Sequence, residues 1–188
     1  MLAGRRGDAR PMITPDTKDW TWVLRAPCPE CGFDAATFAR EDVPAMLRAN
    51  AGAWREALGR PDARERPAPD KWSALEYGCH VRDVCRIYLE RLRLIRTQDA
   101  PLFPNWDQDA TAVEDRYDTQ DPRVVADELV AAADRLATAL AEVSGAEWDR
   151  TGTRSDGAHF TIDTFARYFI HDPLHHLWDV TGERYRRR

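Results

Sequence analysis

HFTIDTFARYFIHDPLHHLWDVTG, residues 159–182, decides the fold, because it combines a helical apolar pattern with four of the five histidines of the chain. Its apolar residues recur every three or four positions, which predicts an amphipathic helix packed into a core. They are Ile162, Phe165, Phe169, Ile170, Leu174, Leu177 and Trp178. Pro173 lies inside this pattern and predicts either a kink or a new helix start, with Asp172 as the N-cap.

Two overlapping pairs of polar side chains, each four residues apart, run along this helix. On a helical wheel, His176 lies at the edge of the apolar stripe and Asp172 just outside it. Side chains at this spacing lie about 5–6 Å apart at Cβ, close enough to hold one metal ion. His171 and His175 project to the opposite, wetter face, so the wheel favours Asp172 with His176 and leaves the other pair as the alternative. Without a metal, Asp172 is only a cap and the histidines are partly exposed polar residues.

Composition predicts a single soluble domain with its own core. Hydrophobic residues make up 43% of the 188 residues, and no apolar run approaches the ~18 residues of a membrane span. The net charge of −5 and the lack of a concentrated basic face exclude the pattern of a nucleic-acid binder. The opening residues, MLAGRRGDARPMITPD, lack the apolar segment of a signal peptide. Four cysteines without such a signal favour a reducing environment, so we expect a cytoplasmic protein with no membrane partner.

Residues 1–40 lack helical periodicity and predict an irregular arm that lies on the body of the protein. Cys28-Pro-Glu-Cys31-Gly resembles half of a zinc knuckle, which needs two more ligands. Cys79 and Cys85 are six residues apart in a predicted helix and do not form the second half, which argues against a site of four thiolates. Cys28 and Cys31 are therefore a separate knuckle, a plain turn with reduced thiols, or a redox dithiol.

A second helix has the strongest start signal in the chain, because Ser73 and Glu76 form a capping box. His80 lies on the border of the apolar stripe of this helix. A lone histidine at such a position is usually a packing residue. Facing Asp172 and His176, however, it would be the third ligand that an open metal site requires.

Two more amphipathic helices are predicted, one over residues 43–58 and one that begins at Asp121-Pro122 and ends before Gly145. Residues 99–120 and 146–160 are predicted to be polar connections. Four amphipathic helices joined by loops predict an all-α four-helix bundle over residues 41–188, preceded by the irregular arm of residues 1–40.

Two motifs resemble a known family: Trp72-Ser73-x-x-Glu76-x-x-x-His80-x-x-Asp83 and His171-Asp172-x-x-His175-His176-x-x-Asp179. Together they are similar to the DinB-like superfamily of metal-binding four-helix bundles, which includes the N-terminal domain of mycothiol-dependent maleylpyruvate isomerase. The similarity covers roughly residues 40–182. It implies a divalent metal, zinc or nickel, bound by His80, Asp172 and His176. Many members have histidine, and the isomerase glutamate, where this chain has Asp172, so the pair His171 and His175 stays open.

The resemblance implies a metal-dependent thiol transferase or isomerase. In this hypothesis, a low-molecular-weight thiol such as mycothiol is activated at the metal and attacks an electrophilic small molecule. His175 or His171 would act as a base or proton carrier, and Asp83 or Asp179 would orient a ligand imidazole. The alternatives are a non-catalytic metal-binding stress or sensor bundle and a hydrolase that uses metal-bound water. Family habit and the surplus of tryptophan suggest a homodimer.

Overall fold

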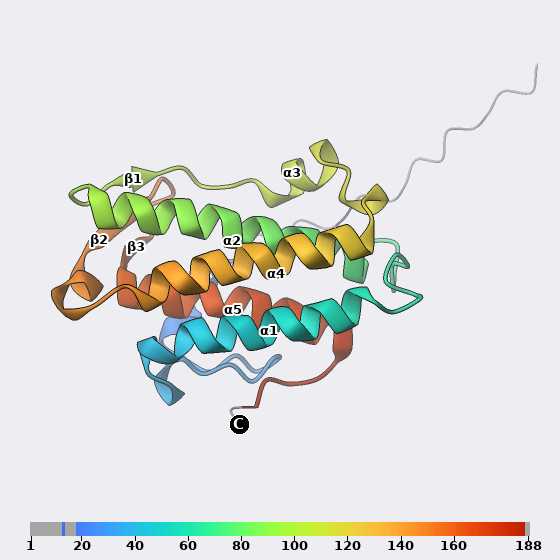
Figure 1. The fold of residues 1–188 in the computed structure, drawn as a ribbon, viewed down its shortest axis with the longest axis horizontal. Helices are drawn as coiled ribbons and strands as arrows, with labels where there is room; N and C mark the ends of the chain where they lie inside the picture. Colours follow the sequence, from blue (N-terminus) through green and yellow to red (C-terminus); the bar gives the residue numbers. More distant parts are fainter. Residues whose placement is uncertain (1–12, 14–17, 187–188) are drawn as a thin grey trace, which may run out of the picture.

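Four long helices lie side by side in the computed structural model, which describes residue 13 and residues 18–186 (Figure 1). They are α1 (Val43–Leu58), α2 (Ala74–Thr97), α4 (Pro122–Ala141) and α5 (Ile162–Thr181). The predicted four-helix bundle is therefore confirmed. Most of residues 1–16, the stretch expected not to be a signal peptide, lies outside the described residues. Within the described part of the chain, no helix is both long and apolar enough to cross a membrane.

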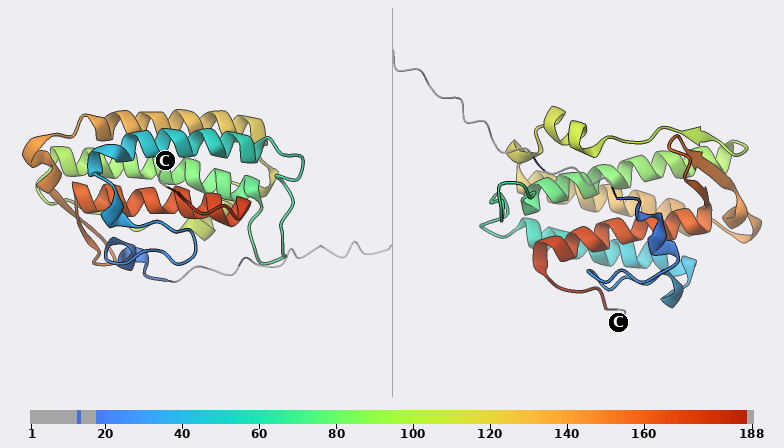
Figure 2. Two further views of the ribbon diagram at one scale, coloured as in Figure 1. Left: turned by 90° about the horizontal axis from the view of Figure 1, so that it is seen from below. Right: turned by 180° about the vertical axis from the view of Figure 1, so that it is seen from behind.

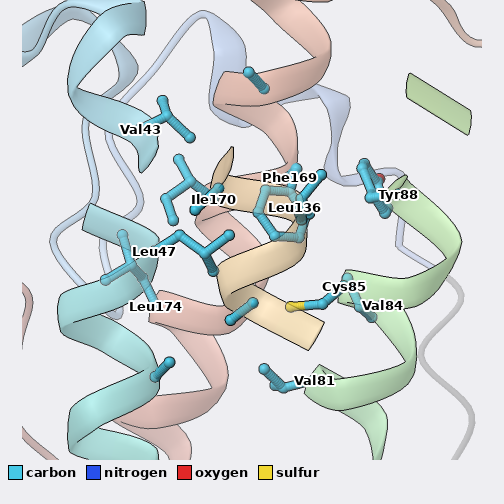
Figure 3. Close-up of a cluster of buried hydrophobic side chains, with 14 of the residues drawn as sticks. Val43, Leu47, Val81, Val84, Cys85, Tyr88, Leu136, Phe169, Ile170 and Leu174 are labelled. Atoms are coloured by element: carbon cyan, nitrogen blue, oxygen red, sulfur yellow. The ribbon is translucent and has the colours of Figure 1, made fainter. Parts of the chain in front are cut away.

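The bundle is not wound in sequence order. α4 and α5 each pack against both α1 and α2, whereas α1 and α2 make fewer contacts with each other. Figure 3 shows the core between the four helices, to which Leu47, Val81, Leu136 and Phe169 each contribute from a different helix. All four of these side chains are buried, as the three- and four-residue spacing of each helix predicts.

The helix starts follow the signals in the sequence. The hydroxyl of Ser73 accepts a hydrogen bond from the backbone N–H of Glu76 at 3.2 Å, and the Glu76 carboxylate accepts one from the Ser73 N–H at 2.8 Å. Asp121 caps α4 in the same way, by accepting from two backbone N–H groups of the first turn. These caps fix where α2 begins, and with it the position of His80 in its second turn.

α5 continues through Pro173 as one helix, so neither a break nor a new start occurs there. The carbonyl of Pro173 accepts hydrogen bonds from Asn50 Nδ2 at 3.0 Å and from Trp54 Nε1 at 3.3 Å, both on α1. This part of α5 is thereby anchored to α1. The helical spacing of Asp172 and His176 is preserved as a result.

The two predicted connections contain short elements that the sequence did not reveal. A three-stranded sheet joins β1 (Leu102–Phe103), β2 (Thr151–Arg154) and β3 (His159–Thr161), with β1 parallel and β3 antiparallel to β2. The first connection also holds a short helix, α3 (Gln108–Glu114). Single 3-10 turns cover Trp20–Leu24, Ala35–Thr37, Arg40–Asp42, Tyr117–Thr119 and Gly145–Asp149. Strands of two to four residues are too short to show a recognisable alternation.

Gly152 allows this sheet to lie close to α2. A Cβ at this position would come within 2.8 Å of Ile95 Cγ1 and 2.9 Å of Phe103 Cε1, both in buried side chains. We expect Gly152→Ala to lower the free energy of unfolding by about 1–3 kcal/mol because the site is already full. In Gly52→Ala, the matched control on α1, a Cβ meets nothing within 4 Å, so we expect a gain of about 0.5–1 kcal/mol. Urea unfolding of both variants measures the difference, and equal effects would contradict this account.

Candidate functional site

The three residues predicted to share a metal lie together at one side of the bundle. His80 comes from α2, and Asp172 and His176 come from α5. Asp172 Oδ2 lies 3.4 Å from His80 Nε2 and 3.8 Å from His176 Nε2. One donor atom from each residue falls within 4.8 Å of the other two. We call this group the open cluster, for its position on the cleft described below.

Aromatic side chains hold the His80 ring in place. The ring is stacked on Trp106 with centroids 5.3 Å apart, and Trp72 lies 5.5 Å away on another side. His80 is 1% exposed, so its orientation is set by packing and not by solvent. A buried imidazole that cannot turn is already oriented for a partner, which lowers the entropy cost of binding.

The donor atoms of the open cluster suit a divalent metal. His80 Nδ1 and Asp172 Oδ1 are buried and have no hydrogen-bond partner among the described residues. Burial alone would raise the pKa of Asp172, but the imidazoles of His80 and His176 outweigh this effect and lower the pKa to about 2. The carboxyl group is therefore ionised at neutral pH. Two imidazoles and one carboxylate form a common donor set for zinc and other transition metals, and leave coordination positions open. The residues present therefore fit a metal ion.

Asp179 orients one of these imidazoles. Its Oδ2 lies 2.9 Å from His176 Nδ1, which leaves His176 Nε2 on the side of Asp172. A carboxylate on the outer nitrogen is the usual support of a metal-binding histidine, since it fixes the tautomer and the ring. The same Asp179 oxygen lies 3.9 Å from His175 Nε2. Of the two residues expected to orient an imidazole, Asp179 makes this contact.

Asp83 belongs to a separate polar cluster. Its carboxylate accepts two hydrogen bonds from Arg82 at 2.9 Å each, one from the Tyr117 hydroxyl at 2.7 Å and one from Arg86 at 3.0 Å. Burial raises the pKa of Asp83, but the bonds from Arg82 and Tyr117 outweigh it and hold the pKa below its ordinary value. Asp83 therefore ties α2 to the 3-10 turn that contains Tyr117.

This cluster predicts a dependence of stability on pH. Because the pKa of Asp83 is lower in the folded state, its ionised form stabilises the fold fully above the unfolded value of about 3.9. The stabilisation is lost as the pH falls through the folded pKa. We expect Asp83→Asn to lower the free energy of unfolding at pH 7 by about 3 kcal/mol, and its difference from the wild type to shrink below about pH 4.

Urea unfolding at pH 7, 5 and 3 measures this difference. Asp127→Asn is the matched control, because Asp127 pairs with Arg55 at 3.0 Å on the surface with 77% of its side chain exposed. Such a pair contributes below about 1 kcal/mol. Equal losses in the two variants at pH 7 would contradict the role given to Asp83.

A cleft of about 1420 Å³ runs past the open cluster. His80, Asp172 and His176 line it together with the aromatic side chains of Trp72 and Trp106. Tyr77 and Trp20 also contribute to its walls. The open cluster is thus accessible to a small molecule from the cleft.

His171 and His175 lie in a second cluster, together with Cys28 and Cys31. We call it the closed cluster, because the four residues expose 4%, 7%, 1% and 0% of their surfaces. The expectation that the two histidines face the wetter side of the helix is therefore wrong. Burial, followed by the neighbouring His175, lowers the pKa of His171 to about 4, so this imidazole is neutral at pH 7.

His171 and His175 are buried because the N-terminal arm lies across their face of α5 (Figure 2). The ring of Trp20 lies 5.3 Å from that of His171 and 4.9 Å from that of His175, and Phe33 lies 5.1 Å from His171. A helical wheel identifies the face that meets the bundle, but it contains no information on a segment that covers the other face.

The two pairs taken as alternatives in the sequence thus belong to different clusters. Sequence reasoning missed the combination of the CxxC turn with the His171 and His175 pair. The signal was present, since two cysteines spaced by three and two histidines spaced by four are a common set of zinc ligands. Cys79 and Cys85 are buried, and in the described part of the chain they belong to neither cluster.

The comparisons with known proteins agree with this architecture. A sequence model described as the DinB superfamily matches residues 46–180, a range that contains His80, Asp172 and His176. YfiT from Bacillus subtilis, a solved structure described as a probable metal-dependent hydrolase with an unusual four-helix bundle topology, superposes with a TM-score of 0.63. The match covers 91% of each chain at 17% sequence identity, which shows a shared fold. No curated protein matches this chain. Since the family match spans most of its length, the chain belongs to the DinB superfamily.

Proposed function

We propose that this protein is a metal-dependent thiol transferase or isomerase, which joins a low-molecular-weight thiol of the mycothiol type to an electrophilic small molecule. One observation carries the proposal. The open cluster lines a cleft of about 1420 Å³ and directs donor atoms from His80, Asp172 and His176 to one point. The inference is that this point holds a divalent ion, zinc or nickel, and that substrates reach it through the cleft.

Each residue of the open cluster has a defined task in this proposal. His80, Asp172 and His176 would hold the metal, and Asp179 keeps the Nε2 atom of His176 available by accepting from Nδ1. A bound divalent ion supplies positive charge that lowers the pKa of a thiol or a water molecule beside it. The aromatic rings of Trp72 and Trp106 shield the site from bulk solvent on one side.

The size of the cleft favours a reaction with two substrates. Pockets for one drug-sized ligand typically enclose about 300–1000 Å³. The volume of about 1420 Å³ leaves room for a thiol beside a second small molecule. Tyr77 and Trp106 provide flat apolar surface in its walls, and charged side chains of both signs also line it. The cleft therefore suits polar molecules that also carry an apolar part.

Hydrolysis by an activated water molecule is a second candidate, because YfiT is described as a probable metal-dependent hydrolase. The same three residues and the same cleft would serve it. A thiol has an ordinary pKa of about 8.5, whereas that of water is about 15.7, so a thiol needs less assistance to ionise. Asp179, a carboxylate that contacts the open cluster from outside it, is already paired with His176. Because water is the weaker acid, its activation depends more on a free base than that of a thiol. The pairing of Asp179 therefore favours the thiol.

The test is an activity screen of the full chain loaded with zinc or nickel. Epoxides, aryl halides and unsaturated acids are offered with mycothiol, bacillithiol or glutathione, and esters and amides are offered without a thiol. We expect turnover that requires one of the thiols, and a change in the visible spectrum of the cobalt-substituted protein when that thiol is added. Hydrolysis without a thiol would overturn the proposal in favour of the second candidate. A protein that binds metal but responds to no thiol would be a non-catalytic metal-binding bundle.

A further inference from the structure

We propose that the closed cluster is a second metal site, in which Cys28, Cys31, His171 and His175 bind one structural Zn²⁺ ion and fasten the N-terminal arm to α5. The inference goes beyond the proposed function, because the site has four protein ligands and no position for a substrate. The site joins two distant segments of the chain, since Cys28 and His175 are 147 residues apart in the sequence. The two pairs of ligands come from a CxxC turn and from one face of a helix.

The distances agree with tetrahedral zinc. Cys28 Sγ lies 3.6 Å from His175 Nδ1. With Zn–S at about 2.3 Å and Zn–N at about 2.0–2.1 Å, a sulfur and a nitrogen on one tetrahedral ion lie about 3.6 Å apart. One donor atom from each of the four residues falls within 4.8 Å of the other three. A single thiol–imidazole hydrogen bond would explain one of these contacts but not the convergence of all four.

The turn that carries the cysteines has the form of a zinc knuckle. The Cys28 N–H donates to the Phe33 carbonyl at 2.7 Å, and the Gly32 N–H donates to the Cys28 carbonyl at 3.0 Å. Gly32 has a φ of +79°, a conformation that glycine adopts without strain. This closed turn brings both sulfur atoms to the same side, where His171 and His175 lie.

The outer atoms of the two histidines support the assignment. His175 Nε2 lies 3.7 Å from Glu30 and 3.9 Å from Asp179, so carboxylates face the nitrogen that points away from the cysteines. Negative charge near the outer nitrogen favours metal binding at the inner one. His171 Nε2 is buried and has no hydrogen-bond partner among the described residues. An ion would use this nitrogen, whose burial without a partner is otherwise unfavourable.

Charge balance explains why such a site is tolerated in the interior. Two thiolates neutralise the two positive charges of Zn²⁺, and two neutral imidazoles add none. The rings of Trp20, Phe33 and Trp178 cover the histidines. The C-terminal tail closes the other side, where the Tyr185 N–H donates to the Cys31 carbonyl at 2.8 Å. An ion with four protein ligands is structural, in contrast to one held by the three residues of the open cluster.

The first test is metal content with two matched variants. We expect two zinc ions per chain in the wild type, and one in each of Cys28→Ser and His80→Ala. After cobalt substitution, His80→Ala should keep the thiolate-to-cobalt charge-transfer absorption, and Cys28→Ser should lose it. A different result would overturn the closed site: one ion in the wild type, none in His80→Ala and one in Cys28→Ser. That result would leave the proposed function intact. The reverse pattern would confirm the closed site and contradict the open one.

A second test uses the wild type alone and does not depend on the folding of a variant. Cysteine alkylation is followed by mass spectrometry in reducing buffer, before and after removal of zinc with a chelator. We expect the labelling rate of Cys28 and Cys31 to rise at least about 10-fold when zinc is removed. Cys79 and Cys85, buried in α2, are the internal controls and should not change. Labelling of Cys28 and Cys31 that is indifferent to the chelator would overturn the proposal.

Discussion

His80→Ala is expected to lower the affinity of the open cluster for a divalent ion by more than about 100-fold and to remove thiol-dependent turnover. Loss of a residue that only supports a ligand typically costs 10–100-fold in metal affinity, and loss of a ligand itself costs more. Asp172 and His176 would remain, but two donors from one helix hold an ion weakly because most of its coordination positions fall to water. Competition with a chromophoric chelator measures the affinity, and activity is assayed on the same preparation.

The control is His159→Ala, which removes an exposed histidine whose Nδ1 lies 3.1 Å from Thr153 Oγ1 in the small sheet. This variant should keep both the affinity and the activity. His80→Ala also empties space between Trp72 and Trp106, so a conservative variant is needed as well. His80→Asn fills part of that space but offers no imidazole, and it should behave like the alanine variant. An asparagine variant with wild-type affinity would contradict a ligand role for His80.

Asp172→Asn tests the same site from α5. It removes one negative charge with little change in shape. If Asp172 were only a helix residue near Pro173, the substitution would leave the metal affinity unchanged. If Asp172 is a ligand, Asp172→Asn should lose metal affinity to an extent comparable to His80→Ala. His171→Ala distinguishes the clusters, because it should leave the affinity of the open cluster within about 10-fold of the wild type.

The helices and the open cluster could be predicted because their signals are local. The capping box at Ser73 and Glu76 fixes the start of α2, and the spacing of apolar residues fixes which sides of α2 and α5 meet. His80, Asp172 and His176 lie near the borders of those apolar stripes. Their convergence therefore follows once the two helices pack, and the family motif points to the same residues.

The closed cluster could not be predicted because it depends on where an aperiodic arm lies. Residues 18–42 contain only short 3-10 turns, so nothing in their spacing shows which face of the bundle they cover. Trp20, Phe33 and the CxxC turn bury a face of α5 that would be solvated without the arm. The wheel consequently assigned His171 and His175 to the polar side. Long-range packing of this kind is decided by contacts between distant segments and leaves no periodic pattern.

Loss of the ion from the closed cluster is expected to free the arm from α5 while the bundle stays folded. In Cys31→Ser, amide hydrogen exchange should become at least about 1000-fold faster for the backbone N–H groups of Cys28, Gly32 and Tyr185. Each 1.4 kcal/mol corresponds to a factor of ten, and structural zinc contributes about 10–16 kcal/mol in small peptides. A 1000-fold increase corresponds to about 4.2 kcal/mol, which is less than half of even the lower figure. The three N–H groups are hydrogen-bonded within or onto the CxxC turn, so their exchange reports directly on its release.

Two comparisons show whether the ion holds the arm. Amides in α1 and α4, which contribute no residue to the closed cluster, should exchange at wild-type rates in Cys31→Ser. His80→Ala should keep the arm amides protected, because its lost ion belongs to the open cluster. Equal arm protection in Cys31→Ser and the wild type would mean that Trp20 and Phe33 alone hold the arm by packing. Since Trp20 also lines the cleft, release of the arm removes part of the cleft wall, and Cys31→Ser should raise KM for the thiol substrate while the open cluster keeps its metal.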